Sequence, residues 1–258
     1  MSLVATWLAT HAHLEPALLC GPAFEHAVAE RRAATGARDD AAYVALLASS
    51  VAECDHLVAG LAVPESWLFR YPQSYDLLVE HLAALATRRP ADSVLPMLSA
   101  GCAAGQEACS MVIAAVHAGW SPERVHVEAV DRNPVALAQA EAGVYSQRSI
   151  RCALPAWAAP WLQIGEGTVR VDPTIRRTIC YRAANLMDVE PGALGSVFDV
   201  VFCRNVLIYL GTAARARLLA TLAERLAPGG LLFLGHAEHL PIISAWFTPG
   251  FITRFPIK

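Results

Sequence analysis

The stretch that most constrains the fold is residues 94–107, VLPMLSAGCAAGQE, in which an apolar run breaks into a turn of small residues. The apolar part predicts a buried strand, and Gln106 and Glu107 open an amphipathic helix. A strand, a loop and a helix in this order form the unit of an open α/β sheet, which binds ligands at the carboxyl ends of its strands. Gly101 and Gly105 permit positive φ and close approach of a ligand. Because the stretch lacks the G-x-G-x-x-G spacing and a following Lys-Ser or Lys-Thr, an ordinary strand-to-helix turn fits it equally well.

A second apolar segment, Val125–Val130, ends in an acidic residue, Asp131. Nucleoside-binding α/β folds place a carboxylate at the end of the second strand, where it accepts hydrogen bonds from both ribose hydroxyls. Alternatively, Asp131 caps the helix that begins near Pro134, since D-R-N-P is a good helix start. Its place one strand after the glycine loop favours the ribose role.

The strongest predicted strand is Phe198–Cys203, which is followed at once by Arg204 and Asn205. These polar residues fall at the ligand-bearing edge of the predicted sheet. Asn205 offers a ligand both an amide donor and a carbonyl acceptor. It also fits a turn in which the side chain binds its own backbone. Further strands are expected around Ala183–Asp188 and in the LLFLG run after the P-G-G turn.

The hydrophobic pattern divides the chain into two parts. Residues 1–86 repeat helical spacing, which predicts a small all-α N-terminal domain. Its expected helices are Ala23–Ala34, ended by Gly36, a second capped by Asp39 or Asp40, Val51–Leu61 and Tyr75–Ala86. Residues 93–258 carry the α/β pattern, and an alternating segment at about 146–181 predicts an inserted antiparallel β subdomain.

Between the helical repeats lies LAVPESWLFRYPQSY, where Arg70 stands among Trp67, Phe69 and Tyr71. Stacking on aromatic rings fixes a guanidinium in place, as a binding site requires. The alternative is a domain-linking helix with core aromatics and an arginine that reaches water.

Composition narrows the class of protein. A net charge of −3 and a pI near 6.3 argue against nucleic acid as a partner. No apolar run approaches the ~20 residues of a membrane span, and the N-terminus lacks the basic residues of a secretory signal. Seven cysteines without a C-x-x-C pair indicate a reducing compartment, so we expect a cytoplasmic protein without direct membrane insertion.

Two further clusters are weaker signals. The histidine pairs at 11/13 and 236/239 lack a third ligand at metal-site spacing, so no metal is expected. Arg31, Arg32 and Arg38 form either a docking face for an acidic partner or, with their acidic neighbours, a solvated helix end.

Six segments together resemble, in order, the motifs of the CheR family, the S-adenosylmethionine-dependent protein-glutamate O-methyltransferases of bacterial chemotaxis. They are VPESWLFR, SAGCAAGQEACS, AVDRNP, ANLMD, FDVVFCRNVLIYL and LAPGGLLFLGHAEHL. The resemblance runs from about Ala23 to near the C-terminus. It implies an α/β fold with a Rossmann-like S-adenosylmethionine-dependent methyltransferase domain, a small all-α N-terminal domain and an inserted antiparallel β subdomain.

The resemblance also implies roles for single residues. Glu107 and Asp131 hold the amino group and the ribose of the cofactor, while Arg70 orients the substrate carboxylate and Tyr209 lines the same cleft. This sequence differs from the family pattern at Pro64, where an Asn is usual, and at Gln106, where a Glu is usual. The full set of implied cofactor contacts is Ser66, Arg70, Gly101, Glu107, Asp131, Asn185, Leu186, Asn205 and Val206.

The expected reaction is methyl transfer from S-adenosylmethionine, leaving S-adenosylhomocysteine, to glutamates in the cytoplasmic helical region of a chemoreceptor. One alternative is a small-molecule methyltransferase on the same fold. Another is a non-catalytic signalling module that binds the cofactor or its product. This alternative is disfavoured by the presence of Arg70, Asp131, Asn205 and Tyr209. A nicotinamide dehydrogenase is disfavoured by the broken glycine pattern.

Overall fold

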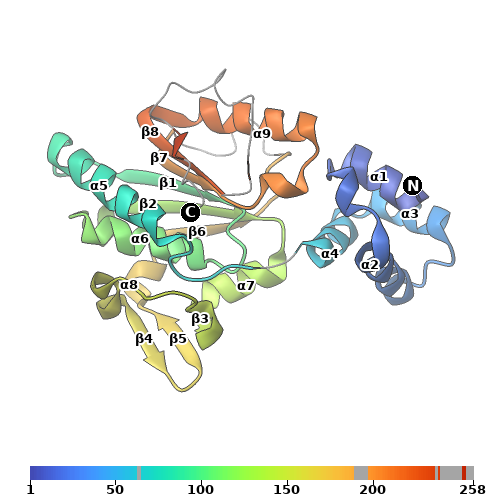
Figure 1. The fold of residues 1–258 in the computed structure, drawn as a ribbon, viewed down its shortest axis with the longest axis horizontal. Helices are drawn as coiled ribbons and strands as arrows, with labels where there is room; N and C mark the ends of the chain where they lie inside the picture. Colours follow the sequence, from blue (N-terminus) through green and yellow to red (C-terminus); the bar gives the residue numbers. More distant parts are fainter. Residues whose placement is uncertain (63–64, 189–196, 236–237, 239–251, 254–258) are drawn as a thin grey trace. The chain divides into compact units, whose positions relative to one another are not determined.

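The computed structural model describes residues 1–62, 65–188, 197–235, 238 and 252–253 (Figure 1). The chain divides into two compact units. The first comprises Met1–Pro64 with Val206–Leu219, and the second comprises Glu65–Asn205 with Ala220–Lys258. The domain boundary expected from the sequence lies further along the chain, after residue 86, whereas here helix α5 (Pro72–Arg88) belongs to the second unit.

The first unit is helical, and its caps follow from the sequence. Helix α2 ends at Gly36, which adopts the left-handed φ of +71° that glycine tolerates. Asp39 caps α3 by accepting a hydrogen bond from the Ala42 N–H at 2.8 Å. Both local predictions are confirmed. The helices from residues 1–64 are α1 (Leu3–His11), α2 (Gly21–Thr35), α3 (Asp40–Ser49) and α4 (Val51–Leu61), with a short 3₁₀ turn at Pro16–Leu18.

Among the described residues, no single helix is long and apolar enough to cross a membrane, although α3 and α4 together, bent by 113°, meet that criterion by length and composition. Both helices contribute buried side chains to the core of the first unit, including Tyr43, Leu47 and Leu57.

A polar network lies beside this core. Arg31 donates to both carboxylate oxygens of Glu53, and the buried Tyr43 hydroxyl donates to the same carboxylate at 2.7 Å. Arg32 pairs with Asp40, and Arg38 lies 3.4 Å from the Asp39 carboxylate. The three arginines therefore have acidic partners within their own unit, which favours the solvated helix end over a docking face.

We predict that Glu53→Gln lowers the free energy of unfolding of this unit by about 2 kcal/mol, because it breaks a largely buried pair whose arginine is partly exposed. Burial alone raises the pKa of Glu53, but the hydrogen bonds from Arg31 and Tyr43 outweigh it, and the pKa is lowered. This stabilisation is thus complete above the unfolded-state pKa of about 4.3 and is lost as the pH falls through the lower folded-state value.

Hydrogen exchange of the α2–α4 amides between pH 7 and pH 3 measures both effects. The control is Asp40→Asn, which breaks the more exposed pair with Arg32 and is expected to cost less than about 1 kcal/mol. Equal protection in the two variants would contradict the prediction.

The second unit is built on a parallel sheet of order β6-β2-β1-β7-β8-β9, whose strands lie side by side in Figure 1. Pairing places Ser99 of β1 beside Ala129 of β2 and Phe202 of β7. The strands are β1 (Leu95–Ala100), β2 (Val125–Asp131), β6 (Ile179–Ala183), β7 (Phe198–Cys203), β8 (Leu226–Leu234) and β9 (Ile252–Thr253).

Two strand predictions need correction. The strand expected at Ala183–Asp188 lies earlier, at Ile179–Ala183, because Asn185 turns the chain by accepting a hydrogen bond from the Met187 N–H. The P-G-G turn lies within β8, where the register with β7 shifts between Phe198 and Val200. The hairpin expected near the C-terminus lies largely outside the described residues, and β9 pairs parallel to β8.

Helix α6 (Gln106–His117) occupies the centre of the second unit's core, with nine of its residues buried. It packs against α5 and against the 3₁₀ segment Ala156–Trp161. Helices α7 (Pro134–Ala142), α8 (Pro173–Arg176) and α9 (Thr212–Glu224) complete the described helices, together with short 3₁₀ turns at Pro122–Arg124, Gln147–Ser149 and Leu207–Tyr209.

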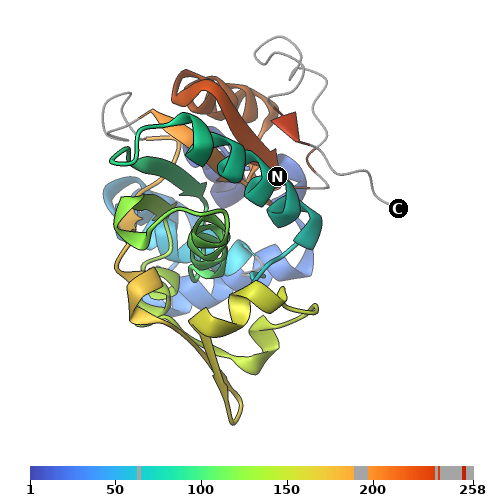
Figure 2. The same ribbon diagram turned by 90° about the vertical axis from the view of Figure 1, so that its left-hand side faces the viewer.

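The inserted segment forms a three-stranded antiparallel sheet of order β3-β5-β4. Figure 2 shows it as a hairpin that extends away from the main sheet of the same unit. Its strands are β3 (Val144–Ser146), β4 (Leu162–Gly165) and β5 (Thr168–Val171). The expected α/β fold with an inserted antiparallel β subdomain is confirmed, but the last residues assigned to the insertion, 179–181, belong to β6 of the main sheet.

Candidate active site

The carboxyl ends of five parallel strands meet at one edge of the main sheet. Gly101 follows β1, Asp131 ends β2, Asn185 lies two residues after β6, Asn205 follows β7 by two residues, and Gly235 follows β8. Because these strands are parallel and adjacent, their ends face the same side. The convergence expected for Gly101, Asp131 and Asn205 is therefore observed.

The glycine loop is held by backbone hydrogen bonds to β2. Gly101 donates to the Val130 carbonyl at 2.8 Å and has a φ of +81°. Gly105 also has a positive φ, but a Cβ there would lie 2.6 Å from the Tyr181 hydroxyl and 2.7 Å from the Ala140 Cβ. The positive φ expected at both glycines is confirmed, and Gly105 also permits close packing of the loop against Tyr181 and Ala140.

Asp131 organises this loop through both carboxylate oxygens. Oδ2 accepts from the Ala103 N–H at 2.8 Å, and Oδ1 accepts from the Asn133 N–H at 2.9 Å. The cap of α7 is Asn133, whose side chain accepts from the N–H groups of Val135 and Ala136. The alternative that Asp131 caps this helix is therefore wrong. A carboxylate has about four acceptor positions, so two remain for a ligand.

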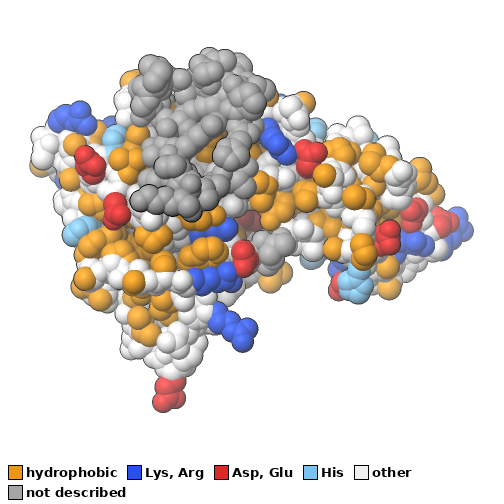
Figure 3. All heavy atoms as spheres, viewed as in Figure 1, with side chains coloured by type: hydrophobic (Ala, Val, Ile, Leu, Met, Phe, Trp, Pro, Cys, Tyr) orange, Lys and Arg blue, Asp and Glu red, His pale blue; other side chains and the backbone are white. Residues whose placement is uncertain are grey.

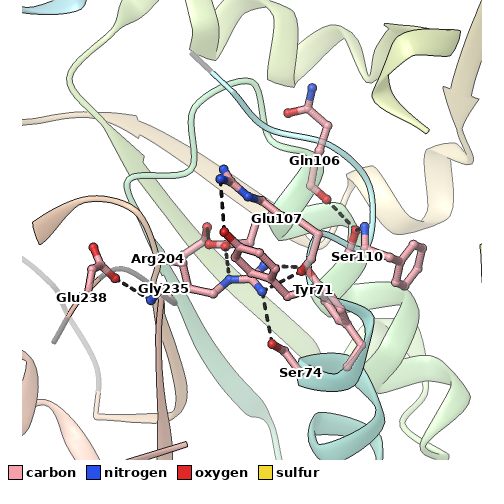
Figure 4. Close-up of polar contacts among 12 residues, drawn as sticks. Tyr71, Ser74, Gln106, Glu107, Ser110, Arg204, Gly235 and Glu238 are labelled. Atoms are coloured by element: carbon pink, nitrogen blue, oxygen red, sulfur yellow. Dashed lines mark hydrogen bonds and ion pairs between the residues drawn. The ribbon is translucent and has the colours of Figure 1, made fainter. Parts of the chain in front are cut away.

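Glu107 on α6 is fixed by two partners. Ser99 Oγ donates to Oε1 at 2.8 Å, and Arg204 Nε donates to Oε2 at 2.8 Å (Figure 4). The Arg204 side chain is 1% exposed and the Glu107 side chain 12% exposed. Burial alone lowers the pKa of Arg204, but Tyr75 and Glu107 beside it outweigh burial, and the pKa is raised. Burial raises the pKa of Tyr75 to about 12.

Arg70 is held by aromatic stacking, as one of the two sequence interpretations predicts. Its guanidinium lies 4.3 Å from the Trp67 ring centroid and 5.1 Å from that of Tyr71. Nη1 donates to the Glu65 carbonyl, and Nη2 lies 3.4 Å from the Tyr71 hydroxyl. Arg151 also stacks over Trp67, at 4.8 Å, and pairs with the Glu65 carboxylate. The described residues from Glu65 to Arg70 form no helix, so the linking-helix alternative is wrong.

Backbone strain is concentrated in the loops at this edge. Phe69, Tyr71, Ala103 and Asn205 are non-glycine residues with φ between +47° and +62°. Each such conformation costs about 1–3 kcal/mol and persists where the surroundings enforce it, as in binding sites. Asn is the residue among these four that tolerates the left-handed region best.

Among the residues that the structure describes, three buried polar atoms of the site have no hydrogen-bond partner: Gln106 Oε1, Asn205 Oδ1 and Arg70 Nε. Figure 4 shows the Gln106 side chain directed away from Arg204. Buried polar atoms without a partner are rare in folded proteins. Two acceptors and one donor are therefore free for a ligand that brings both donors and acceptors.

The remaining predicted residues are placed as follows. Ser66 lies half-buried in the loop before Trp67, and Asn185 and Leu186 lie in the turn after β6, whose Ala184 N–H donates to the Asp131 carbonyl at 3.0 Å. Val206 and Tyr209 belong to the first unit, where the Tyr209 carbonyl accepts from the Glu15 N–H. Their roles stay predictions. Pro64 and His236 lie outside the described residues.

Two charged residues at this edge received no role from the sequence. Arg204 binds Glu107, and the buried Glu238 accepts from the Gly235 N–H next to Asn205. For Arg204 the signal in the sequence is a charged side chain inside a long apolar run, which requires a buried partner. Which partner it finds depends on segments far away in the chain.

Cysteine chemistry does not fit the site. Burial raises the pKa of the Cys102 and Cys203 thiols, and nearby carboxylates raise it further. The reactive form of a cysteine nucleophile is the thiolate. These two thiols are therefore unsuited to nucleophilic catalysis.

Residues 65–255 match the family described as "CheR methyltransferase, SAM binding domain". This match covers well over half of the chain. The chain belongs to the CheR methyltransferase family. The resemblance carried by the sequence motifs is thus confirmed, and the matched range includes all five strand ends described above.

Several relatives support this membership. Proteins described as probable biofilm formation methyltransferase WspC are 33% identical in Pseudomonas putida and 34% identical in Pseudomonas aeruginosa, over 84% and 83% of this chain. Each alignment covers 51% of the WspC protein, so the chain spans about half the length of these relatives. A chemotaxis protein methyltransferase of Klebsiella aerogenes is 32% identical over 82% of this chain and 73% of that protein.

The unpartnered atoms fit the cofactor of this CheR domain. The amino-acid end of S-adenosylmethionine carries an ammonium, which only donates, and a carboxylate, which only accepts. The free acceptors Gln106 Oε1 and Asn205 Oδ1 match the ammonium, and the free donor Arg70 Nε matches the carboxylate. The Asp131 carboxylate, half-exposed at the end of β2, matches ribose hydroxyls.

Proposed function

We propose that this protein methylates glutamate side chains in the cytoplasmic helical region of a bacterial chemoreceptor, using S-adenosylmethionine. One observation carries the proposal: Arg70 is fixed to Arg204, which follows β7 at the strand-end edge. Its carbonyl accepts from Arg204 at 2.8 Å and its guanidinium stacks on Trp67. A cation held in this way suits a substrate that carries a carboxylate.

The contacts of Asp131 and Glu107 already described support the binding roles that we propose. Asp131 and Glu107 would hold the ribose and the amino group of the cofactor, with Ser66, Gly101, Asn185, Leu186, Asn205 and Val206 as further contacts. When bound, S-adenosylmethionine supplies an electrophilic sulfonium methyl group. The departure at Gln106 replaces a charged acceptor by a neutral one, but its Oε1 remains free to accept.

The chemistry needs alignment more than acid–base catalysis. A glutamate side chain has an ordinary pKa of about 4.3 and is ionised at neutral pH, so no general base is required. Holding two reactants in line contributes roughly 7–11 kcal/mol of barrier reduction. We assign this work to Arg70, which would orient the incoming carboxylate, and, on the family resemblance, to Tyr209.

The charge of the inserted β subdomain favours an acidic partner. Residues 144–178 contain five arginines and two carboxylates. Four of these arginines, Arg148, Arg151, Arg170 and Arg177, are exposed. In Figure 3 blue side chains gather along one side of the part that holds β3, β4 and β5. Complementary charge of this kind favours rapid docking of an acidic helical surface.

The test is transfer of label from radiolabelled S-adenosylmethionine to receptor-containing membranes. We expect label on the receptor that mild base releases as methanol, because a carboxyl methyl ester is base-labile. Membranes without the receptor are the control. The prediction is that label depends on both the receptor and the protein.

Other outcomes identify the alternatives. Base-stable label on protein would place the methyl group on another atom and contradict glutamate as the acceptor. Label in small molecules without a receptor would indicate a small-molecule methyltransferase. Binding of S-adenosylhomocysteine without any transfer would indicate a non-catalytic signalling module.

A further inference from the structure

The Arg204 side chain contacts residues of two segments of the candidate site, Glu107 on α6 and the segment from Arg70 to Tyr75. Nη1 donates to the Arg70 carbonyl at 2.8 Å and lies 3.4 Å from Ser74 Oγ, while Nη2 donates to the Tyr75 hydroxyl at 3.0 Å. Nε donates to Glu107. Figure 4 shows Arg204 between Glu107 and Ser74, with dashed lines leading from its guanidinium. One buried cation thus joins the end of β7 to α6 and to the start of α5.

Burying a cation in this way is not explained by stability. Removing a guanidinium from water is costly, and replacing a buried ion pair by apolar residues is often neutral or stabilising. The aromatic rings around it, with Phe202 at 4.6 Å and Tyr75 at 5.4 Å, offset only part of that cost. A role in the site therefore accounts for Arg204 better than a role in folding.

On one side Arg204 fixes a carboxylate. Glu107 accepts one hydrogen bond on each oxygen, from Ser99 and from Arg204, so its orientation is determined by these two partners. The carboxylate keeps further acceptor positions for a ligand ammonium. Without Arg204, Glu107 would be free to change rotamer.

On the other side Arg204 fixes a strained backbone. Phe69 and Tyr71, which flank Arg70, have φ of +54° and +61°. Side-chain hydrogen bonds hold this segment: Ser110 Oγ accepts from the Phe69 N–H at 3.0 Å, and Arg204 donates to the Arg70 carbonyl. Strained residues persist only where such contacts enforce them. Arg204 therefore helps to fix the backbone from which the Arg70 side chain extends.

We propose that Arg204 is a positioning residue that couples the amino-acid end of the cofactor site, at Glu107, to the placement of Arg70. Arg204 does not itself need to touch a ligand. The inference rests on the proposed function, because it assumes that Glu107 and Arg70 face cofactor and substrate.

The test is Arg204→Lys, which keeps the charge but cannot reach all four acceptors. Calorimetry measures binding of two ligands, S-adenosylhomocysteine and 5′-methylthioadenosine, which lacks the amino-acid end. We expect the variant to bind S-adenosylhomocysteine roughly 10- to 100-fold more weakly, the range for loss of a hydrogen bond to a charged group, and methylthioadenosine within about twofold of wild type. A merely structural role would weaken both ligands alike.

The matched control is Arg89→Lys. Arg89 also binds a buried carboxylate, donating from both Nη atoms to Asp199 near the start of β7, whereas Arg204 follows the end of the same strand. Arg89→Lys is expected to lower the melting temperature and to leave both affinities unchanged.

A double variant checks that Arg204 acts through Glu107. If it does, Arg204→Lys adds little to the loss of S-adenosylhomocysteine affinity in Glu107→Gln. Should Arg204→Lys fail to fold, Tyr75→Phe removes one acceptor of the same guanidinium and is expected to give a smaller loss selective for S-adenosylhomocysteine.

The outcomes separate the two proposals. Wild-type protein that binds neither ligand contradicts the proposed function itself. Wild-type protein that binds both, with variants that lose both equally or neither, overturns the role of Arg204 alone. Full additivity with Glu107→Gln also overturns it.

Discussion

Replacing Arg70 by alanine is expected to lower kcat about 100- to 1,000-fold, the usual effect of removing one electrostatic contact to the reacting groups. The affinity for S-adenosylhomocysteine should change less than about tenfold, because Arg70 contributes a single contact to it. The Arg70 backbone is held by the hydrogen bond from Arg204 to its carbonyl, and the guanidinium by stacking on Trp67. Truncation therefore removes the guanidinium and leaves the backbone in place. The measurements are base-labile methyl transfer at saturating receptor and calorimetry with the product.

Two variants sharpen this test. Arg151→Ala removes another guanidinium from the Trp67 ring and an exposed pair with Glu65, so kcat should stay within about threefold of wild type. Arg70→Lys keeps the charge but loses the planar fork, and we expect an intermediate kcat. Equal turnover in Arg70→Ala and wild type would remove Arg70 from the mechanism.

What the sequence predicts well is local. Gly36 ends α2 and Asp39 begins α3 because each acts on backbone groups within three or four residues. The strand ends that carry Gly101, Asp131 and Asn205 are predictable for a related reason, since parallel strands must present these positions at a common edge. Neither inference needs knowledge of a distant partner.

What the sequence does not predict depends on partners far along the chain. Arg204 binds residues from segments near 70–75 and at Glu107, about 130 and 97 positions away. Arg31 pairs with Glu53, so a cluster that reads as a basic face is neutralised internally. Gly105 lies close to Tyr181, which belongs to β6, and the sequence predicts that strand too late, at 183–188. Burial and pairing of this kind follow only from the assembled fold.

The second large effect is expected at Asp131. Asp131→Asn should weaken binding of S-adenosylhomocysteine about 100-fold or more, because an amide nitrogen cannot accept a hydrogen bond and the charge offered to the ribose hydroxyls is lost. One of the two N–H groups now bound, of Ala103 or Asn133, would also lose its acceptor. Calorimetry with S-adenosylhomocysteine measures the change.

Two comparisons separate ribose recognition from loop organisation by Asp131. Asn133→Ala removes the α7 cap, at a cost of about 1 kcal/mol in stability, but should leave the affinity within about threefold of wild type, since among the described residues its side chain accepts from Val135 and Ala136 of its own helix. Wild type should bind adenosine more tightly than 2′,3′-dideoxyadenosine, and Asp131→Asn should bind the two alike. A variant that keeps the wild-type preference for adenosine would show that Asp131 acts on the Ala103 loop and not on the ribose, because only direct contact with the hydroxyls makes affinity depend on their presence.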